Sequence, residues 1–573
     1  MPRKIIQRPP VYTHPLLEVG NGVCSTGHPV SAEAGVRIMQ RGGNAFDALV
    51  AAAFTTFVME PESCGIGGYG HISAYVAAKQ EYLSVDAYCR APGDARPDMF
   101  KIDTTLPPTY YGHPQTLGSE ADIGWRAIAV PGAVAGLCDT HEMLGRLSLA
   151  AVLEPAIEAA EAGVPVTFKH KLEIAKSLDN IRRFPDTAAS LLVDGKMPQI
   201  AGQDGGGDRL DTCQLAKLLK RISKRGKIAF QGGATARRIG DYIRSNGGIL
   251  SAQDIANYRP RVLREQPVRY RKHDYVACFD QVAYQTLNIL SHYDLKAYGP
   301  DSYAYRHLTA EALGVSFIDS MTHYGDPDFV DSPVNGLANL AYAKHRRKLI
   351  RLNKALPRPI VAGDPWPFDE RGLEPERLLE SPTLARRGGT SQVAVADAEG
   401  NIACACISIG AGYGSLIFVP EFGIFMNNAM SNFDPRPEHP SHIEPGKMPI
   451  FAAPAIVAAS GGEARFAASG SGGYRIEPGV VQTMMNVVDF GMPVQRAVDH
   501  PRVHCQGGAT YVDSRIGEAV LNRMRRAGHD LQILVENPGA NNFGRICAVT
   551  RNPRTGTLSA GAGPAWATGV AGY

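Results

Sequence analysis

The hydrophobic pattern of the sequence changes once, at the end of an irregular stretch that covers residues 353–389. This stretch contains six prolines and many charged residues but little apolar periodicity, which predicts an exposed linker without regular secondary structure. Before it, and above all over 144–349, apolar residues recur mainly at helical spacing, whereas after it they alternate as in β-strands. We therefore expect an α+β protein with a helix-rich part over 1–389 and a β-rich part over 390–573.

The clearest helices are predicted where capping residues and apolar spacing agree. A first helix should begin at Pro29 and end before Gly42. The following stretch, Ala45–Met59, is nearly all apolar, which predicts a buried helix. Leu149–Ala162 and 304–324 show the most regular helical spacing of the middle region.

A glycine-rich run over 64–70 follows the predicted buried helix and precedes a strand-like stretch over 71–76. A phosphate-binding loop would instead follow a strand and open a helix. The run is therefore interpreted as a place of tight backbone packing, not as a nucleotide site.

The β-rich part begins with a hairpin. Val393 and Val395 alternate with alanines, 398–401 supplies turn residues, and 402–409 returns as a second strand. Further strands around Ile456, Phe466 and Ile546 and a helix over 477–490 are also expected.

The composition is that of an ordinary globular protein, with 44% hydrophobic and 20% charged residues and a net charge of +3. The densest basic run, 344–348, is interpreted as a solvated helix face, not as a nucleic-acid patch. No apolar run approaches the roughly 20 residues of a membrane span, and no apolar signal core follows the basic N-terminus. The ten cysteines lack a CxxC pattern and are interpreted as reduced core residues. We expect a cytoplasmic protein without nucleic-acid or membrane partners.

Thr390 lies at the junction of linker and hairpin, directly after Gly388 and Gly389. Its hydroxyl can attack the carbonyl of Gly389, and hydrolysis of the resulting ester would cut the chain between the two residues. Glycine helps because this attack needs a strained backbone, which glycine adopts at low cost. The α-amine released on Thr390 has a pKa near ~8, so it can serve as the base for its own hydroxyl. Taken alone, a Gly-Gly-Thr run is a weak signal, and a turn before a strand is the simpler explanation.

Several short motifs, spread over nearly the whole chain, favour self-cleavage over a simple turn at Thr390. In order they are Asn44-Ala45-Phe46-Asp47-Ala48, Gly65-Ile66-Gly67-Gly68, Arg90-Ala91-Pro92, Val130-Pro131-Gly132-Ala133-Val134-Ala135-Gly136, Gly325-Asp326-Pro327-Asp328-Phe329, the residues 397–401, Asn427-Asn428, Gly470-Ser471-Gly472-Gly473 and Ala571-Gly572-Tyr573. With these motifs in this order, the sequence resembles the γ-glutamyltransferase family of N-terminal nucleophile hydrolases. So many ordered matches are highly specific for that family.

The resemblance implies a four-layer αββα sandwich that two autoproteolytic fragments, 1–389 and 390–573, form together. It implies that these fragments associate as a heterodimer, and it leaves open whether that heterodimer dimerises further. It implies no metal ion and no organic cofactor. His500 and His504 lack a third ligand nearby in the sequence, so zinc is not expected there.

The resemblance also assigns the catalytic roles. Thr390 becomes the nucleophile of both self-cleavage and turnover, with cleavage after Gly389. Ser408 stands where the family has a second threonine that supports the nucleophile, so the hydroxyl is kept. The backbone amides of Gly472 and Gly473 form the oxyanion hole, where each donor is typically worth ~3 kcal/mol. The other explanation of this glycine pair is a tight turn before a helix.

The substrate-binding positions depart from the family pattern. Arg90 matches the arginine that grips the substrate α-carboxylate, a role suited to a guanidinium fork. Asn432 replaces the aspartate that pairs with the α-amine, and Gly410 replaces an asparagine that contacts the same amine. Phe451 and Ala452 replace two serines that help to hold the carboxylate.

These departures predict a substrate without an α-ammonium group, because a buried ammonium without its counter-charge would cost several kcal/mol. We expect an autoprocessed amidohydrolase for a small carboxylate-bearing acyl group, such as an oxamate- or glutaryl-type amide. Relatives in the family, including oxamate amidohydrolases and cephalosporin acylases, act on such substrates. Two alternatives stay open: a γ-glutamyltransferase or glutathione hydrolase with an altered amine site, and a non-catalytic member that uses the fold as a binding scaffold.

Overall fold

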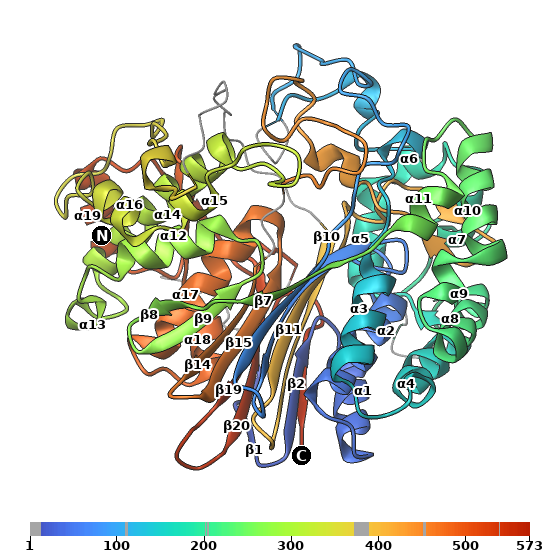
Figure 1. Ribbon diagram of the computed structural model, residues 1–573, viewed down its shortest axis with the longest axis horizontal. Helices are drawn as coiled ribbons and strands as arrows, with labels where there is room; N and C mark the ends of the chain where they lie inside the picture. The colour runs from blue at the N-terminus through green and yellow to red at the C-terminus, as the bar shows by residue number, and fades with distance from the viewer. Residues whose placement is uncertain are drawn as a thin grey trace, which may run out of the picture.

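The computed structural model describes residues 13–108, 113–200, 202, 206–371, 389–450, 454–537 and 539–573. Within these ranges, two seven-stranded sheets form the middle of the molecule, and helices cover the outer face of each sheet (Figure 1). The predicted four-layer αββα sandwich is therefore confirmed.

The first sheet combines strands from both sides of the predicted cut, and its neighbouring strands are antiparallel. Its order is β21 (Gly569–Gly572), β2 (Gly22–Thr26), β10 (Gly389–Asp397), β11 (Ile402–Gly410), β3 (Tyr69–Val76), β4 (Glu81–Ala87) and β7 (Arg261–Glu265). The predicted hairpin is confirmed, because β10 and β11 pair around the turn at 398–401. Since β10 also pairs with β2, the chain after Gly389 lies inside a sheet that earlier segments complete.

The second sheet lies against the first. Its order is β1 (Leu17–Val19), β20 (Leu558–Ala562), β19 (Arg545–Arg551), β15 (Glu463–Ser471), β14 (Ala455–Ser460), β9 (His273–Ala277) and β8 (Val268–Tyr270). The strands expected around Ile456, Phe466 and Ile546 are confirmed as β14, β15 and β19. The middle region is mainly helical, as expected, but it also contains the strands β7, β8 and β9, which the sequence did not indicate. These strands are only three to five residues long, which is too short for a clear apolar alternation.

The two sheets pack through small side chains. Ala394 and Ala396 of β10 meet residues such as Val457 and Ala467 of the second sheet in a common buried core. Because side chains alternate along a strand, Thr390 shares this inner face with Ala394. The predicted nucleophile therefore lies at one end of the layer between the sheets.

Helices α1 to α11 lie on the side of the first sheet (Figure 1). Their bounds are α1 (Pro29–Gln40), α2 (Ala45–Met59), α3 (Ala133–Leu144), α4 (Leu149–Ala162), α5 (Phe168–Lys176), α6 (Leu178–Ile181), α7 (Pro185–Leu191), α8 (Cys213–Arg225), α9 (Ile228–Gln231), α10 (Gly233–Ser245) and α11 (Ala252–Asn257). All 15 residues of α2 are buried, as its apolar sequence predicts, and Asn44 and Asp47 cap its first turn. The predicted helices at α1 and α4 are confirmed as well.

Helices α12 to α19 belong to the second sheet's side of the molecule. Their bounds are α12 (Gln281–Leu290), α13 (Leu295–Tyr298), α14 (Tyr303–His323), α15 (Val334–Leu337), α16 (Leu340–Arg347), α17 (Ile476–Val488), α18 (Val494–Asp499) and α19 (Glu518–Ala527). Helices α14 and α17 confirm the predictions over 304–324 and 477–490. The basic run on α16 is only partly a solvated face, because Arg346 is buried and pairs with Asp319 at 2.9 Å.

The remaining strands form small sheets outside the two large ones. They are β5 (Val164–Pro165) with β6 (Arg209–Leu210), β12 (Phe418–Val419) with β13 (Ile424–Phe425), and β16 (Val503–Cys505) with β17 (Thr510–Asp513) and β18 (Leu531–Leu534). No helix within the described part of the chain is both long and apolar enough to cross a membrane.

The glycine-rich run packs tightly against β11, as predicted. A Cβ atom on Gly68 would lie 2.3 Å from the carbonyl oxygen of Ser408, and one on Gly70 would lie 2.4 Å from that of Cys406. Side chains cannot occupy these positions without moving the backbone. The run therefore lets β3 approach the strand that carries Ser408.

The predicted linker is described only over 353–371, and its remaining residues up to 388 lie outside the described residues. The described portion is largely irregular, as expected. It is not simply exposed, because Ile360 and Trp366 are buried. These two apolar side chains fix the first half of the segment on the helical layer around α14 and α15.

Candidate active site

Thr390 and Ser408 face each other across β10 and β11. Their hydroxyl oxygens are 3.0 Å apart, and the Thr390 side chain is buried. The Ser408 hydroxyl donates to the carbonyl oxygen of Gly389 at 2.8 Å and accepts from the Gly410 N–H at 3.0 Å. The structure thus brings four predicted residues together around the peptide bond between Gly389 and Thr390.

Arg545, the first residue of β19, links Thr390 to the predicted oxyanion loop. It donates to the Thr390 carbonyl at 3.3 Å and to the hydroxyl of Ser471 at 3.0 Å. Ser471 directly precedes Gly472 and Gly473, whose φ angles of 132° and 60° favour glycine. The glycine pair therefore lies at the end of β15, and Ser471 and Arg545 connect it to the backbone of Thr390.

Four buried or nearly buried charged residues, called here the charge cluster, lie beside Thr390: Glu60, Glu62, Lys169 and Arg545. Glu60 contacts Arg545 at 2.9 Å and Lys169 at 2.7 Å, and Lys169 also contacts Glu62 at 2.7 Å. Ser391 donates its hydroxyl proton to Glu60. Burial alone would raise the pKa of Glu60, but Arg545 and Lys169 hold it at about 2. Glu60 is therefore ionised, and the two carboxylates of the cluster lie beside two basic side chains.

On the other side of Ser408, the inner face of the first sheet continues with two tyrosines. Tyr69 lies opposite Ser408 on β3, and its hydroxyl hydrogen-bonds the Ser408 side chain. The rings of Tyr69 and Tyr88 lie 4.5 Å apart, and their hydroxyls are also hydrogen-bonded. Asn432 donates its amide protons to Tyr88 at 2.6 Å and to Tyr69 at 3.5 Å. The structure thus connects the predicted residue Asn432 to Ser408 through two tyrosines.

The Arg90 side chain contacts protein groups other than Thr390 and Ser408. Its guanidinium contacts the carboxylate of Asp86 at 2.6 Å and the carbonyl oxygens of Tyr88 and Cys89 at 3.2 and 3.1 Å. Burial alone would lower the pKa of Arg90, but Asp86 raises it, so the side chain is charged. These contacts occupy much of its hydrogen-bonding fork, and the role of Arg90 in holding a substrate carboxylate stays a prediction.

Gly410 has a conformational reason for being glycine. Its φ angle is 97°, and a Cβ atom there would lie 1.9 Å from the side-chain oxygen of Asn428. That oxygen accepts a hydrogen bond from the backbone of Ala411 at 2.9 Å. The other two predicted substrate-binding residues, Phe451 and Ala452, lie outside the described residues.

Sequence reasoning missed Tyr69, Tyr88, Arg545 and Glu60. Tyr69 interrupts a glycine run, and Arg545 is the first residue of a strand whose next four residues are apolar, so both carry a weak signal. Tyr88 precedes the predicted Arg90 by two positions and therefore lies on the same side of the extended chain. Their importance comes from contacts between segments far apart in sequence, which local patterns do not encode.

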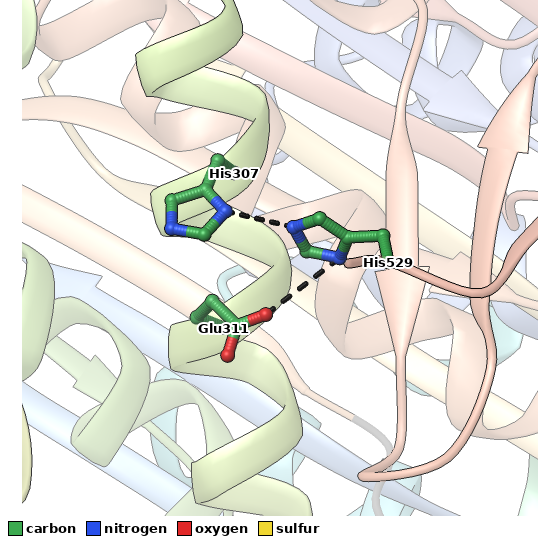
Figure 2. Close-up of side chains that lie close together, drawn as sticks. All are labelled: His307, Glu311 and His529. Atoms are coloured by element: carbon green, nitrogen blue, oxygen red, sulfur yellow. Dashed lines mark hydrogen bonds and ion pairs between the residues drawn. The ribbon is translucent and has the colours of Figure 1, made fainter. Parts of the chain in front are cut away.

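One group of metal-ligating residue types lies elsewhere, on α14 and after α19. We call His307, Glu311 and His529 the histidine cluster (Figure 2). His307 donates from Nε2 to the Arg351 carbonyl at 2.8 Å, so its Nδ1 accepts from His529 Nε2 at 2.7 Å. The hydroxyl of Thr510 then donates to His529 Nδ1 at 3.1 Å. Each imidazole nitrogen therefore has a hydrogen-bond partner.

The carboxylate of this cluster also has its own partner. Glu311 pairs with Arg358 at 2.6 Å, while the Nδ1 of His529 is 3.6 Å away. Burial lowers the pKa of His529 to about 3, which keeps its imidazole neutral. A metal ion there would have to displace these hydrogen bonds next to a paired guanidinium. Hydrogen bonding alone explains the arrangement.

His500 and His504, where no zinc is expected, lie in different surroundings. His500 directly follows α18 and contacts Asp301 and Arg306, each at 3.1 Å. His504 lies on β16 and contacts Gln506 at 3.2 Å. The two histidines thus have different partners and do not share a helical face.

Comparison with known proteins decides the family. The family model described as Gamma-glutamyltranspeptidase matches residues 31–573. The chain belongs to this family. It is 35% identical to the Acylase ACY 1 proenzyme of Pseudomonas sp. (strain SE83), over 94% of this chain and 91% of that protein. It is 30% identical to the Glutathione hydrolase proenzyme of Bacillus subtilis (strain 168), over 90% and 86% of the two chains.

Solved structures agree with this assignment. The cephalosporin acylase from Bacillus halodurans is 27% identical and superposes with a TM-score of 0.84, covering 100% of this chain and 99% of that chain. The predicted membership of the γ-glutamyltranspeptidase family is therefore confirmed, as is its N-terminal nucleophile fold. The protein is an amidohydrolase or transferase of this enzyme class.

Proposed function

We propose that this family member cuts its own chain between Gly389 and Thr390 and then hydrolyses an amide of a small carboxylate-bearing acyl group, of the oxamate or glutaryl type. One observation carries the proposal. The hydroxyl of Ser408 contacts both the hydroxyl of Thr390 and the carbonyl of Gly389 within 3.0 Å. Nucleophile, supporting hydroxyl and scissile carbonyl are thus already in one place in the uncut chain.

Self-cleavage follows from this arrangement. The Thr390 oxygen attacks the Gly389 carbonyl carbon, and the proton that it loses is the one that the Thr390 nitrogen receives in the next step. The Ser408 hydroxyl donates to the carbonyl oxygen as negative charge develops there. The carbon–nitrogen bond then breaks and the nitrogen takes a proton, which leaves Gly389 as an ester on Thr390. Addition of water to the ester releases a carboxylate on Gly389 and restores the hydroxyl of Thr390.

Turnover repeats the chemistry on a substrate amide. The free α-amine of Thr390, with a pKa near ~8, takes the proton of the attacking hydroxyl. The backbone amides of Gly472 and Gly473 stabilise the oxyanion, and the leaving amine receives a proton as the acyl ester forms. Water then hydrolyses the ester. The guanidinium of Arg545, which contacts the Thr390 carbonyl at 3.3 Å, favours the neutral form of the nearby amine.

The two fragments should remain together after the cut. Strand β10 begins at the cleavage site and pairs with β2, and β11 pairs with β3, so strands of both fragments are neighbours at these places in the first sheet. The charge cluster and the histidine cluster also contain residues from both fragments. Separation would expose the core between the sheets, which supports a heterodimer.

The proposed preference for an acyl group without an α-ammonium is supported by the neutral side chain at position 432, which is asparagine and not aspartate. Its amide donates to two tyrosine hydroxyls and offers no counter-charge to an α-ammonium group. The names of two similar proteins, an acylase and a cephalosporin acylase, agree with acyl groups other than γ-glutamyl. A third similar protein is named a glutathione hydrolase, so a γ-glutamyl substrate is the alternative that has to be tested.

Denaturing gels and intact mass spectrometry test the cleavage, and a substrate panel tests the acyl group. We expect two fragments that end at Gly389 and begin at Thr390 in the wild type, and a full-length chain in Thr390→Ala. We expect hydrolysis of glutaryl or oxamic amides to exceed that of γ-glutamyl-p-nitroanilide. If the γ-glutamyl substrate is turned over faster, the acyl group is γ-glutamyl and not of the oxamate or glutaryl type. A wild type that stays full length would support a non-catalytic scaffold.

A further inference from the structure

We propose that Asn541 is a positioning residue of the oxyanion hole, because its side-chain amide fixes the direction of the Gly472 N–H. The inference rests on the proposed turnover at Thr390 and adds a residue that acts through a backbone peptide rather than on the substrate. It concerns the peptide bond between Ser471 and Gly472, at the end of β15, and the segment 541–545, which leads into β19 and lies against it.

The Asn541 side chain holds the carbonyl group that precedes Gly472. Its amide nitrogen lies 3.1 Å from the carbonyl oxygen of Ser471. A carbonyl oxygen can only accept, so the nitrogen of Asn541 is the donor. A trans peptide is planar, and its C=O and N–H point in opposite directions. A bond that holds the Ser471 oxygen toward Asn541 therefore directs the Gly472 N–H away from Asn541.

This peptide needs an outside partner because glycine follows it. Turning the peptide plane changes mainly the ψ angle of Ser471 and the φ angle of Gly472, and glycine accepts φ angles of either sign at low cost. The φ angle of Gly472 is 132°, which few other residues adopt. Without a partner for the Ser471 oxygen, the plane could turn, and the N–H would no longer point to the position where the oxyanion forms.

The segment that carries Asn541 is itself fixed. A Cβ atom on Gly472 would lie 3.2 Å from both the Asn541 amide nitrogen and the Cα atom of Gly544, so the segment packs directly on the glycine loop. The buried guanidinium of Arg502 donates to the carbonyl oxygens of Phe543 and Gly544 at 2.6 and 2.8 Å. Asn541 is only 8% exposed, so water has little access to its hydrogen bond. The Asn541 amide is therefore a fixed point that orients the glycine loop.

The same loop has a second connection, to the nucleophile. The Ser471 hydroxyl accepts from Nε of Arg545 at 3.0 Å, and Arg545 donates to the Thr390 carbonyl at 3.3 Å. These bonds hold the loop near Thr390, but a bond to the side-chain hydroxyl does not determine how the following peptide plane is turned. Asn541 determines it, because it binds the oxygen of that peptide. The place and the direction of the Gly472 N–H thus have separate supports.

Self-cleavage should depend on this support much less than turnover. In the proposed cut, the Ser408 hydroxyl donates to the Gly389 carbonyl oxygen at 2.8 Å, so a side chain of β11 meets the developing charge. In turnover, the backbone amides of Gly472 and Gly473 take that part. Loss of the Asn541 amide should therefore slow turnover while the chain still cuts itself.

The test measures kcat and KM of the mature wild type, Asn541→Asp and Asn541→Leu, since both changes keep the size of the side chain and remove the donor. The probe is whichever of glutaryl-p-nitroanilide, γ-glutamyl-p-nitroanilide and oxamate the wild type turns over fastest. We expect kcat to fall by about ten- to a hundredfold and KM to change by less than about twofold, because an oxyanion amide acts in the transition state. Self-cleavage, followed by mass spectrometry, should proceed at the wild-type rate.

Asn288→Leu is the matched control. Asn288 lies on α12, and its buried side-chain amide donates to the Ala338 carbonyl at 2.7 Å. Its side-chain oxygen, like that of Asn541, has no hydrogen-bond partner among the described residues. This variant should lose a similar amount of stability in urea and keep the wild-type kcat and KM.

The role of Asn541 is overturned if its variants keep the wild-type kcat, or if kcat and the rate of self-cleavage fall together. Where the wild type turns over one of the probes, these results leave the proposed function intact. If Asn541→Leu does not fold, the isosteric Asn541→Asp decides, and failure of both variants to fold would show a structural role and overturn the proposal as well. A wild type that turns over none of the three probes overturns the proposed function and this role together.

Discussion

Two buried polar clusters join the segments before and after Gly389 in different ways. The charge cluster keeps two carboxylates ionised by placing Lys169 and Arg545 beside them, and it contacts the backbone of Thr390. In the histidine cluster, burial lowers the pKa of both His307 and His529 and favours their neutral forms, and a chain of hydrogen bonds links the two rings. Losing one charge leaves an opposite charge buried and unpaired, whereas losing one neutral group breaks only a hydrogen bond. The clusters should therefore differ in the size and the pH range of their contribution to stability.

The largest effect is expected from Arg545→Met. In an uncut Thr390→Ala background, this change should lower the free energy of unfolding by about 3–5 kcal/mol, because Glu60 loses a buried ionic partner. Urea denaturation monitored by circular dichroism would measure it. Arg264→Met is the matched control, since Arg264 and its partner Glu81 have side chains 74% and 33% exposed. Its effect should stay below about 1 kcal/mol. Equal effects at both sites would remove the distinction between the clusters.

Glu60→Gln should have a smaller effect, about 2–3 kcal/mol at pH 7, because Lys169 and Arg545 keep some of their other partners. The pKa of Glu60 is lowered from 4.5 to about 2 in the folded state. The stability it contributes is therefore complete above about pH 4.5 and is lost as the pH falls toward 2. The gap between the parent and the Glu60→Gln variant should close over that range in urea titrations. A gap that stays constant down to pH 3 would contradict the ionised cluster.

His529→Gln should cost about 1 kcal/mol at pH 7, the size of one buried hydrogen bond. The pKa of His529 is lowered from 6.5 to about 3 by burial, so the folded state resists protonation that the unfolded chain accepts. The parent should therefore lose stability as the pH falls below 6.5, and the variant should lose less. Between pH 6.5 and pH 4 the parent should lose about 1.4 kcal/mol per pH unit, so the two curves should cross at about pH 6 and the variant should be the more stable chain below that pH. Parallel curves over this interval would show that His529 is not held neutral.

The layers of this fold follow from local patterns, whereas its polar clusters do not. The all-apolar sequence of α2 and the alternation of Val393 and Val395 predict a buried helix and a hairpin because each signal lies within one element. Glu60, Lys169 and Arg545 meet only when α2, α5 and β19 come together. Thr390 could be singled out because a linker, two glycines and a hairpin meet at its position. The family motifs supplied its expected role and the other candidate site residues.

The short strands of the second sheet were also not predictable from local sequence patterns. β8 has three residues and β9 has five, and each gains its stability from its neighbour in the second sheet rather than from its own sequence. Arg90 was placed by a motif that fixes its position in the chain but not the direction of its side chain. Its pairing with Asp86 depends on a residue four positions earlier, in a strand whose register is set by the sheet.

The smallest effect concerns metal removal. Dialysis against a chelator should leave the thermal midpoint of the uncut chain unchanged, because each nitrogen of the histidine cluster already has a hydrogen-bond partner and Glu311 pairs with Arg358. Equimolar Zn²⁺ should likewise leave it unchanged, with His529→Gln as the control. A ligand present at 100 times its dissociation constant would add about 2.7 kcal/mol. A rise in the midpoint with Zn²⁺ that disappears in His529→Gln would therefore show that the cluster exchanges its internal hydrogen bonds for a metal, and that neutral histidines in this fold serve as ligands rather than as a closed chain.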